Sequence, residues 1–139
     1  MKKPASASRV LEYPALSAAK AKKSLARKLA LETDPSDVAA DLKAGVKGFI
    51  VLDARSAESY AKGHVPGAVH LWHREISAKT VKGLSKKTLI VTYCTGVGCN
   101  ASTKAAYKLA KLGFKVKEMV GGLAWWKQEG YELEAGIKA

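Results

Sequence analysis

The stretch LIVTYCTGVGCNASTKAA, residues 89–106, carries the strongest structural signal in this chain. Its first five residues, 89–93, are apolar, aromatic or β-branched and predict a buried strand of a parallel sheet. Cys94 follows the strand, a glycine-containing loop comes next, and a helix begins near residue 101. In open α/β sheets, ligands bind where a strand ends and a helix begins. We therefore expect a functional site in this loop.

Cys94 combines a nucleophilic side chain with a loop that can offer backbone NH groups. Gly96 and Gly98 allow backbone conformations that other residues resist, and Asn100 or Ser102 can cap the following helix. Loop amides and the positive end of a helix stabilise a thiolate or a bound anion. Cys94 should therefore ionise more easily than a free cysteine, and we take it as the candidate nucleophile.

The rest of the chain alternates strand and helix signals. Repeated units of this length predict an α/β fold with a central parallel sheet of about five strands and helices on both faces. The strands we expect beside 89–93 are 48–52, 69–71 and 116–120, and the helices are 35–44, 56–60, 74–78, 101–112 and 123–129.

The N-terminal residues form a separate, basic region. The chain has a net charge of +12, and residues 1–32 hold eight basic and two acidic side chains, which is half of that excess. Within this region, 17–31 has leucines and alanines at helical spacing among lysines and predicts an amphipathic helix. The helix either packs on the domain with a solvated basic face or docks an acidic partner, RNA or a membrane surface. No aromatic residue interrupts the basic run, which disfavours nucleic acid. We assign 1–32 as a basic extension and 33–139 as the domain.

Composition limits the remaining possibilities. A chain of 139 residues with 47% hydrophobic content suits one modest core. The first ten residues lack an apolar run typical of a signal peptide, and no stretch is suited to span a bilayer. The two cysteines, Cys94 and Cys99, lie in one loop, which argues against a structural disulfide framework. We expect available thiols in a reducing compartment and hence a cytoplasmic protein.

Several spaced motifs match one family in order. They are LDARS at 52–56, GHVPGA at 63–68, VTYC at 91–94, LGFKVKEMVGGLAWW at 112–126 and EGY at 129–131. Over about residues 34–135 the chain resembles a single-domain rhodanese-like sulfurtransferase. The resemblance implies that Cys94 accepts a sulfur atom as a persulfide, from a small anionic donor such as thiosulfate, and passes it to a thiol or cyanide. The basic charge of the chain would also favour an acidic acceptor protein. It implies a substrate pocket formed by the amides of Thr95, Gly96, Val97, Gly98, Cys99 and Asn100, with no metal or organic cofactor.

The loop departs from this family in two respects. Residues 94–102 contain no charged side chain, whereas many relatives carry an arginine or lysine that would grip an anionic donor. The loop is also one or two residues longer than the usual sulfurtransferase loop, a length associated with phosphatases and arsenate reductases. A Cys-X5-Arg phosphatase needs a guanidinium to hold phosphate, and this chain has Asn100 there. The phosphatase or arsenate reductase interpretation is therefore the weaker alternative, and a non-catalytic rhodanese-like binding module is the third.

Four further residues have defined expectations. Asp53 and Arg55 should form a partly buried ion pair that holds the following loop, and His64 should bond to nearby backbone. These three are expected to be structural residues near the site. Cys99 either attacks an oxidised or persulfidated Cys94, as a resolving thiol, or packs the loop against its helix. The histidines lack the spacing of a zinc site, so we expect no metal.

Overall fold

A computed structural model describes residues 7–137 of the chain. The chain divides into two units, one of residues up to Ala30 and one from Leu31 onward. Residues 1–6 of the expected extension and 138–139 of the expected domain lie outside the described residues. In the second unit the elements are β1 (Glu32–Thr33), α2 (Pro35–Ala44), β2 (Phe49–Asp53), α3 (Ala57–Lys62), β3 (Val69–His70), η2 (His73–Glu75), β4 (Leu89–Tyr93), α4 (Ala101–Lys111), β5 (Val116–Met119) and α5 (Gly122–Gln128).

The second unit is built on a five-stranded sheet of order β1-β5-β4-β2-β3, and every pairing is parallel. The strand that precedes Cys94, β4, lies in the middle and pairs with both β2 and β5. Because all strands run the same way, the carboxyl ends of β4, β5 and β1 meet at one edge of the sheet. The expected fold class, a parallel sheet of about five strands with helices, is confirmed.

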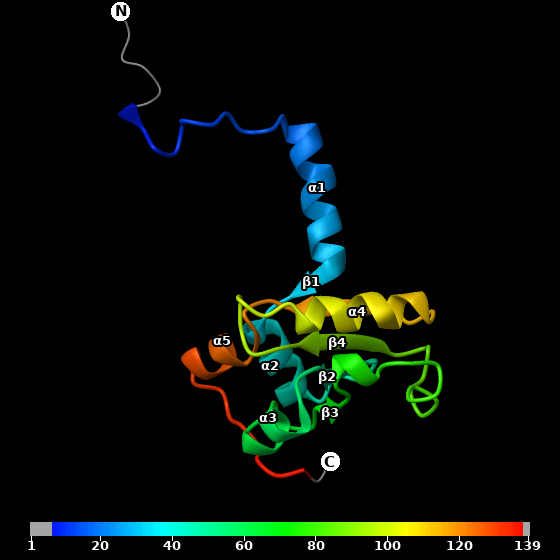
Figure 1. The fold of residues 1–139 in the computed structure, drawn as a ribbon. Coiled ribbons are helices and arrows are strands. Elements are labelled where there is room, and N and C mark those ends of the chain that lie inside the picture. Colours follow the sequence, from blue (N-terminus) through cyan, green and yellow to red (C-terminus); the bar gives the residue numbers. More distant parts are fainter. Residues whose placement is uncertain (1–6, 138–139) are drawn as a thin grey trace, which may run out of the picture. The chain divides into compact units, whose positions relative to one another are not determined.

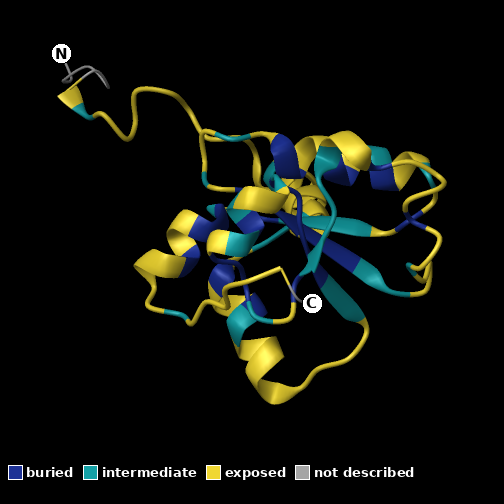
Figure 2. Cartoon of the chain, turned by 60° about the horizontal axis from the view of Figure 1, so that its bottom comes forward, coloured by how far each residue is buried: buried dark blue, intermediate teal, exposed yellow. Residues whose placement is uncertain are grey.

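Helices cover the sheet on both faces, α4 on one and α2, α3 and α5 on the other (Figure 1). Alternate residues of each central strand enter two separate cores. Val91 and Tyr93 of β4 pack in the core that also holds Trp126 of α5, whereas Ile90 and Cys94 pack in the core that holds Leu109 of α4. The buried segments of the strands lie at the centre of this unit (Figure 2). Cys94 therefore projects toward the α4 face.

Local signals in the sequence set both ends of α2 and the start of α3. The Asp34 side chain accepts a hydrogen bond of 2.9 Å from the NH of Asp37 and caps α2, with Pro35 at the first helical position. Gly45, with a φ of 72°, ends this helix in the left-handed conformation. The Ser56 side chain caps α3 in the same way as Asp34 caps α2.

Two elements differ from the expectations. The helix predicted over 74–78 is a three-residue 3-10 turn, η2. Strand β1 was not expected, and it includes Glu32, which the sequence analysis placed in the basic extension. Two residues are too few for a periodic signal, and β1 is defined only by its pairing with β5.

The basic helix expected over 17–31 is present as α1 (Ala18–Leu31). All fourteen of its residues are described, and none of them is buried. Leu25 and Leu29 belong to its apolar face and are 56% and 71% exposed. Within residues 7–137, no helix combines the length and apolar character needed to cross a membrane.

Candidate functional site

The structure joins the two cysteines of the loop by a disulfide bond. The sulfur atoms of Cys94 and Cys99 are 2.02 Å apart, and their Cα atoms are 6.3 Å apart. The expectation of two available thiols is therefore wrong for this form of the protein, in which neither cysteine carries a thiol that titrates. A turn in which the NH of Cys99 donates to the carbonyl of Gly96 folds the loop back and brings Cys99 to Cys94.

Backbone hydrogen bonds from the start of α5 hold the cysteine loop in place. The NH groups of Leu123 and Ala124 donate hydrogen bonds of 2.9 and 2.8 Å to the carbonyls of Cys94 and Thr95. Gly122 has a φ of 58°, and a Cβ there would overlap the carbonyl oxygen of Cys94. Gly122, the first residue of α5, thus allows the two backbones to approach closely.

The loop glycines and the helix cap differ from the expectations. Neither Gly96 nor Gly98 is among the described glycines with positive φ, so neither is needed for a left-handed conformation. Gly96 instead permits close packing, because a Cβ there would lie 3.3 Å from that of Ala124. Asn100 stands at the N-cap of α4 without a side-chain cap bond, and Ser102 lies inside the helix.

A pocket of about 190 Å³ opens beside the disulfide. Cys94, Gly96, Val97 and Cys99 line it, and the expected pocket residues Thr95, Gly98 and Asn100 do not. Cys94 is only 3% exposed and also belongs to the α4-side core. The remaining lining comes from β1, α4 and β5 and the turn that follows β5: Glu32, Ser102, Thr103, Glu118, Met119, Val120, Gly121 and Gly122.

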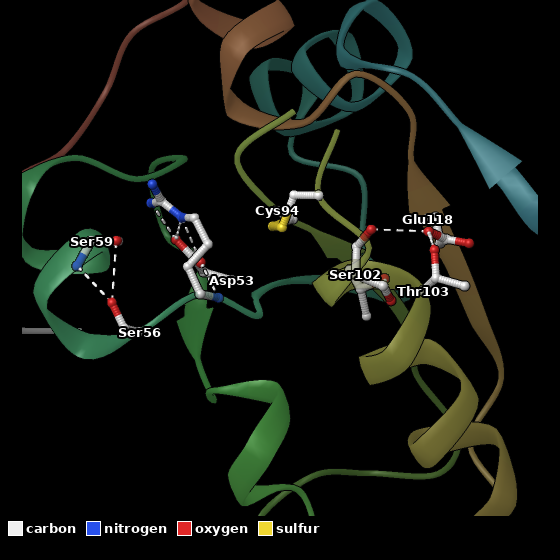
Figure 3. The surroundings of a disulfide bond; sticks show 10 residues. Asp53, Ser56, Ser59, Cys94, Ser102, Thr103 and Glu118 are labelled. Atoms are coloured by element: carbon white, nitrogen blue, oxygen red, sulfur yellow. Dashed lines mark hydrogen bonds and ion pairs between the residues drawn. A yellow bond between two sulfur atoms is a disulfide. The ribbon is translucent and has the colours of Figure 1, made fainter. Parts of the chain in front are cut away.

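The charged groups of this pocket are carboxylates. Glu32 and Glu118 are register partners in adjacent strands, and both line the pocket. The hydroxyls of Ser102 and Thr103 donate hydrogen bonds of 2.9 and 2.7 Å to Glu118 Oε1 (Figure 3). The lining that the described residues provide contains no lysine or arginine. The pocket is therefore acidic although the chain as a whole is strongly basic.

A buried ion pair lies on the other side of Cys94 (Figure 3). Arg55 Nη2 is 2.7 Å from Asp53 Oδ2 and also donates to the carbonyl of Gly63 at 2.6 Å. Burial alone would lower the pKa of Arg55, but the hydrogen bonds and negative charge of Asp53 outweigh it, and the pKa is raised. The expected ion pair is present, and it ties the end of β2 to the turn after α3.

Two of the three histidines, His64 and His70, contact backbone carbonyls. His64 is 1% exposed, its Nδ1 lies 2.8 Å from the carbonyl of Tyr60, and its ring stacks on the Tyr60 ring at 3.7 Å. The backbone bond expected for His64 is confirmed. His70 Nε2 lies 2.8 Å from the Arg55 carbonyl, whereas the buried Nδ1 of His73 has no hydrogen-bond partner among the described residues.

Comparison with known proteins identifies the class. Residues 34–129 match the family of the rhodanese-like domain, which is more than half of the chain. The chain therefore belongs to the rhodanese-like family. The BH2092 protein from Bacillus halodurans has a similar structure, with a TM-score of 0.84 and 43% sequence identity over 87% of this chain and 88% of that chain. The rhodanese-like domain of the Alr3790 protein from Anabaena has a TM-score of 0.68 and 30% identity over 76% of this chain and 80% of that one.

Curated relatives include enzymes and proteins of other kinds. Thiosulfate sulfurtransferase GlpE from Pseudomonas putida is 36% identical over 58% of this chain and 72% of its own. The uncharacterized protein YibN from Escherichia coli is 35% identical over 63% of this chain and 62% of its own. An HTH-type transcriptional regulator from Mycobacterium tuberculosis is 29% identical, and the match covers 38% of its length. The chain thus spans less than two thirds of the length of two of these three relatives.

The sequence did not predict that Glu32 and Glu118 line the pocket, or that Gly121–Gly122 lies against the cysteine loop. The Gly121–Gly122 pair lies just after β5, the strand next to β4 in the sheet. Because parallel strands end at the same edge of a sheet, this order of strands would have placed the glycine pair near the loop that follows β4. Glu118 gives no such signal, because a single carboxylate in a strand is not distinctive.

Proposed function

We propose that this chain is a sulfurtransferase that carries a sulfane sulfur as a persulfide on Cys94. The observation that supports this most is the position of Cys94. It follows the central strand of the sheet, lines a pocket at the carboxyl edge, and is held by backbone hydrogen bonds from α5. The family and the relative GlpE, a thiosulfate sulfurtransferase, support the same reaction class.

The proposed cycle starts once the Cys94–Cys99 disulfide is reduced. The Cys94 thiolate attacks the outer sulfur of a donor such as thiosulfate, forms a new S–S bond and expels sulfite with the electron pair. A nucleophilic acceptor, such as cyanide or a thiol, then attacks the outer sulfur and regenerates the Cys94 thiolate. The first step brings Cys94 to the persulfide level and the second returns it to the thiolate, so the complete cycle needs no outside oxidant and no metal or organic cofactor.

The partners and location follow from charge and redox state. Because the pocket is lined by Glu32 and Glu118, we propose that thiosulfate is a weak donor and that donors without a double negative charge bind better. The net charge of +12 favours encounter with an acidic acceptor protein. The need for reduced thiols favours the cytoplasm.

The test is mass spectrometry on the reduced protein. After thiosulfate is added and removed, Cys99→Ser should gain the mass of one sulfur atom on the peptide that contains Cys94, and cyanide should release it as thiocyanate. The double variant Cys94→Ser/Cys99→Ser should show neither signal. Absence of both signals with every sulfane donor tried would refute the proposal and favour a non-catalytic module. Cys94-dependent hydrolysis of an aryl phosphate would instead favour the phosphatase alternative.

A further inference from the structure

The Cys94–Cys99 disulfide places a second sulfur on the candidate nucleophile. Cys99 lies five positions further along the same loop, and its sulfur is bonded to that of Cys94. The turn from Gly96 to Cys99 and the hydrogen bonds from α5 are backbone interactions. The loop conformation that aligns the two sulfurs therefore depends on the main chain as well as on the S–S bond.

We propose that Cys99 is a resolving thiol that converts the sulfane sulfur on Cys94 into sulfide. The inference rests on the proposed function, because it needs a Cys94 persulfide as its starting point. It adds an activity to that function: the chain would act as a thiol-dependent reductase of sulfane sulfur as well as a carrier.

The step balances without an outside oxidant. The Cys99 thiolate attacks Sγ of Cys94, the Cys94–Cys99 bond forms, and the bond between Cys94 Sγ and the sulfane sulfur breaks. The sulfane sulfur leaves as hydrosulfide with the bonding electron pair, so it is reduced by two electrons while the two cysteines are oxidised to the disulfide. A dithiol reductant then restores both thiols by exchange and is itself oxidised to a disulfide.

The surroundings favour release of the sulfur by this route. Cys94 is 3% exposed and the Cys99 sulfur lies within bonding reach of it, so Cys99 is better placed than a thiol from solution to attack Cys94 Sγ itself. The adjoining pocket of about 190 Å³ has room for a small leaving group. Its charged lining residues, Glu32 and Glu118, repel a hydrosulfide anion and so disfavour its retention.

The experiment is a single turnover under anaerobic conditions, with fully reduced protein freed of reductant and thiosulfate as the donor. The wild-type chain should release one sulfide per chain without any added thiol and lose the mass of two hydrogen atoms. Cys99→Ser and Cys99→Ala should instead retain the sulfur on Cys94 and release sulfide only in proportion to an added dithiol. The alanine variant shows whether a change seen with Cys99→Ser is caused by the serine hydroxyl rather than by loss of the thiol. Wild-type protein without donor should stay reduced, which excludes residual oxygen as the source of the disulfide.

The outcomes separate the two proposals. A stable persulfide on wild-type Cys94, with the Cys99 thiol still free, would overturn the resolving role while supporting the proposed function. Transfer of the sulfur to Cys99, located by fragmentation of the peptide that contains both cysteines, would also overturn it and indicate a relay. Equal sulfide release from wild type and both variants without a thiol would do the same. Failure of the wild type and both variants to take up or release any sulfur, with thiosulfate and with every other sulfane donor tried, would overturn the proposed function itself, and the inference with it.

Discussion

The hydroxyl of Tyr93 donates a hydrogen bond of 2.6 Å to Asp53 Oδ2 and so links the strand that precedes Cys94 to the buried ion pair. The hydroxyl oxygen of Tyr93 also accepts a hydrogen bond of 3.0 Å from the NH of Val65. Burial and the Asp53 carboxylate raise the pKa of Tyr93, so its hydroxyl remains protonated and donates to Asp53 at neutral pH. The residue beside the candidate nucleophile thus joins β4, the end of β2 and the turn after α3.

Removal of the Tyr93 hydroxyl should destabilise this unit. Tyr93→Phe leaves the buried NH of Val65 without its partner, and we expect the free energy of unfolding to fall by about 1–3 kcal/mol. Urea denaturation followed by circular dichroism measures this. Tyr107→Phe is the matched control, because that side chain is 64% exposed. Equal losses for the two variants would contradict the role assigned to the Tyr93 hydroxyl.

The ion pair should matter more than any single hydrogen bond. Asp53 is fully buried, and Arg55→Met would leave its carboxylate without a cation, which should cost about 3–5 kcal/mol. The double variant Asp53→Asn/Arg55→Met removes both charges and should recover part of that loss. Urea denaturation of both variants gives the comparison. If the double variant is less stable than Arg55→Met alone, an unpaired charge is not the cause.

Most of the sheet could be predicted from the sequence, and most of the pocket could not. The strand Leu89–Tyr93 and the helix Ala101–Lys111 have long apolar patterns that identify them without knowledge of their neighbours. The pairing of Glu32 with Glu118 depends on an edge strand of two residues, and the disulfide depends on how the loop folds back at Gly96. Both are tertiary relationships, which spacing along the chain does not encode.

The fit between Gly122 and the cysteine loop can be tested by adding one methyl group. Gly122→Ala would bring its Cβ into the carbonyl of Cys94 and 3.0 Å from the NH nitrogen of Gly96. We expect a lower melting temperature and slower sulfur loading of reduced protein. Gly130→Ala is the control, because Gly130 has a φ of 84° with no atom near the added Cβ and reports backbone strain alone. A loading rate as fast for Gly122→Ala as for Gly130→Ala would show that this contact does not position the loop.

Removing a negative charge from the pocket should strengthen the binding of anionic donors. Glu118→Gln keeps an oxygen that accepts the bonds from Ser102 and Thr103 but removes one negative charge from the pocket. We expect the KM for thiosulfate to fall several-fold at low ionic strength, with a smaller difference in high salt. Steady-state thiocyanate formation measures it. Glu129→Gln removes an exposed carboxylate that does not line the pocket and should leave KM nearly unchanged. An equal effect of both substitutions would mean that overall charge, not the pocket, governs donor binding.

His73 should make the stability of the domain depend on pH. Burial, and then the positive charges of Lys108, Lys104 and Arg74, lower its pKa from the ordinary value of 6.5. The unfolded chain therefore binds a proton at a higher pH than the folded chain does. The contribution of neutral His73 to the free energy of unfolding therefore has its full value above pH 6.5. It declines as the pH falls toward the folded-state pKa.

The change that tests this is His73→Gln, which removes the titrating ring. The difference in unfolding free energy between wild type and variant, measured by urea denaturation at closely spaced pH values, should be constant above pH 6.5. Below that pH, the free energy of unfolding of the wild type should fall relative to that of the variant by at most about 1.4 kcal/mol per pH unit. A difference that stays constant through the acidic range would show that the folded protein accepts the proton on His73 as readily as the unfolded chain, and that its buried Nδ1 carries no penalty for charge.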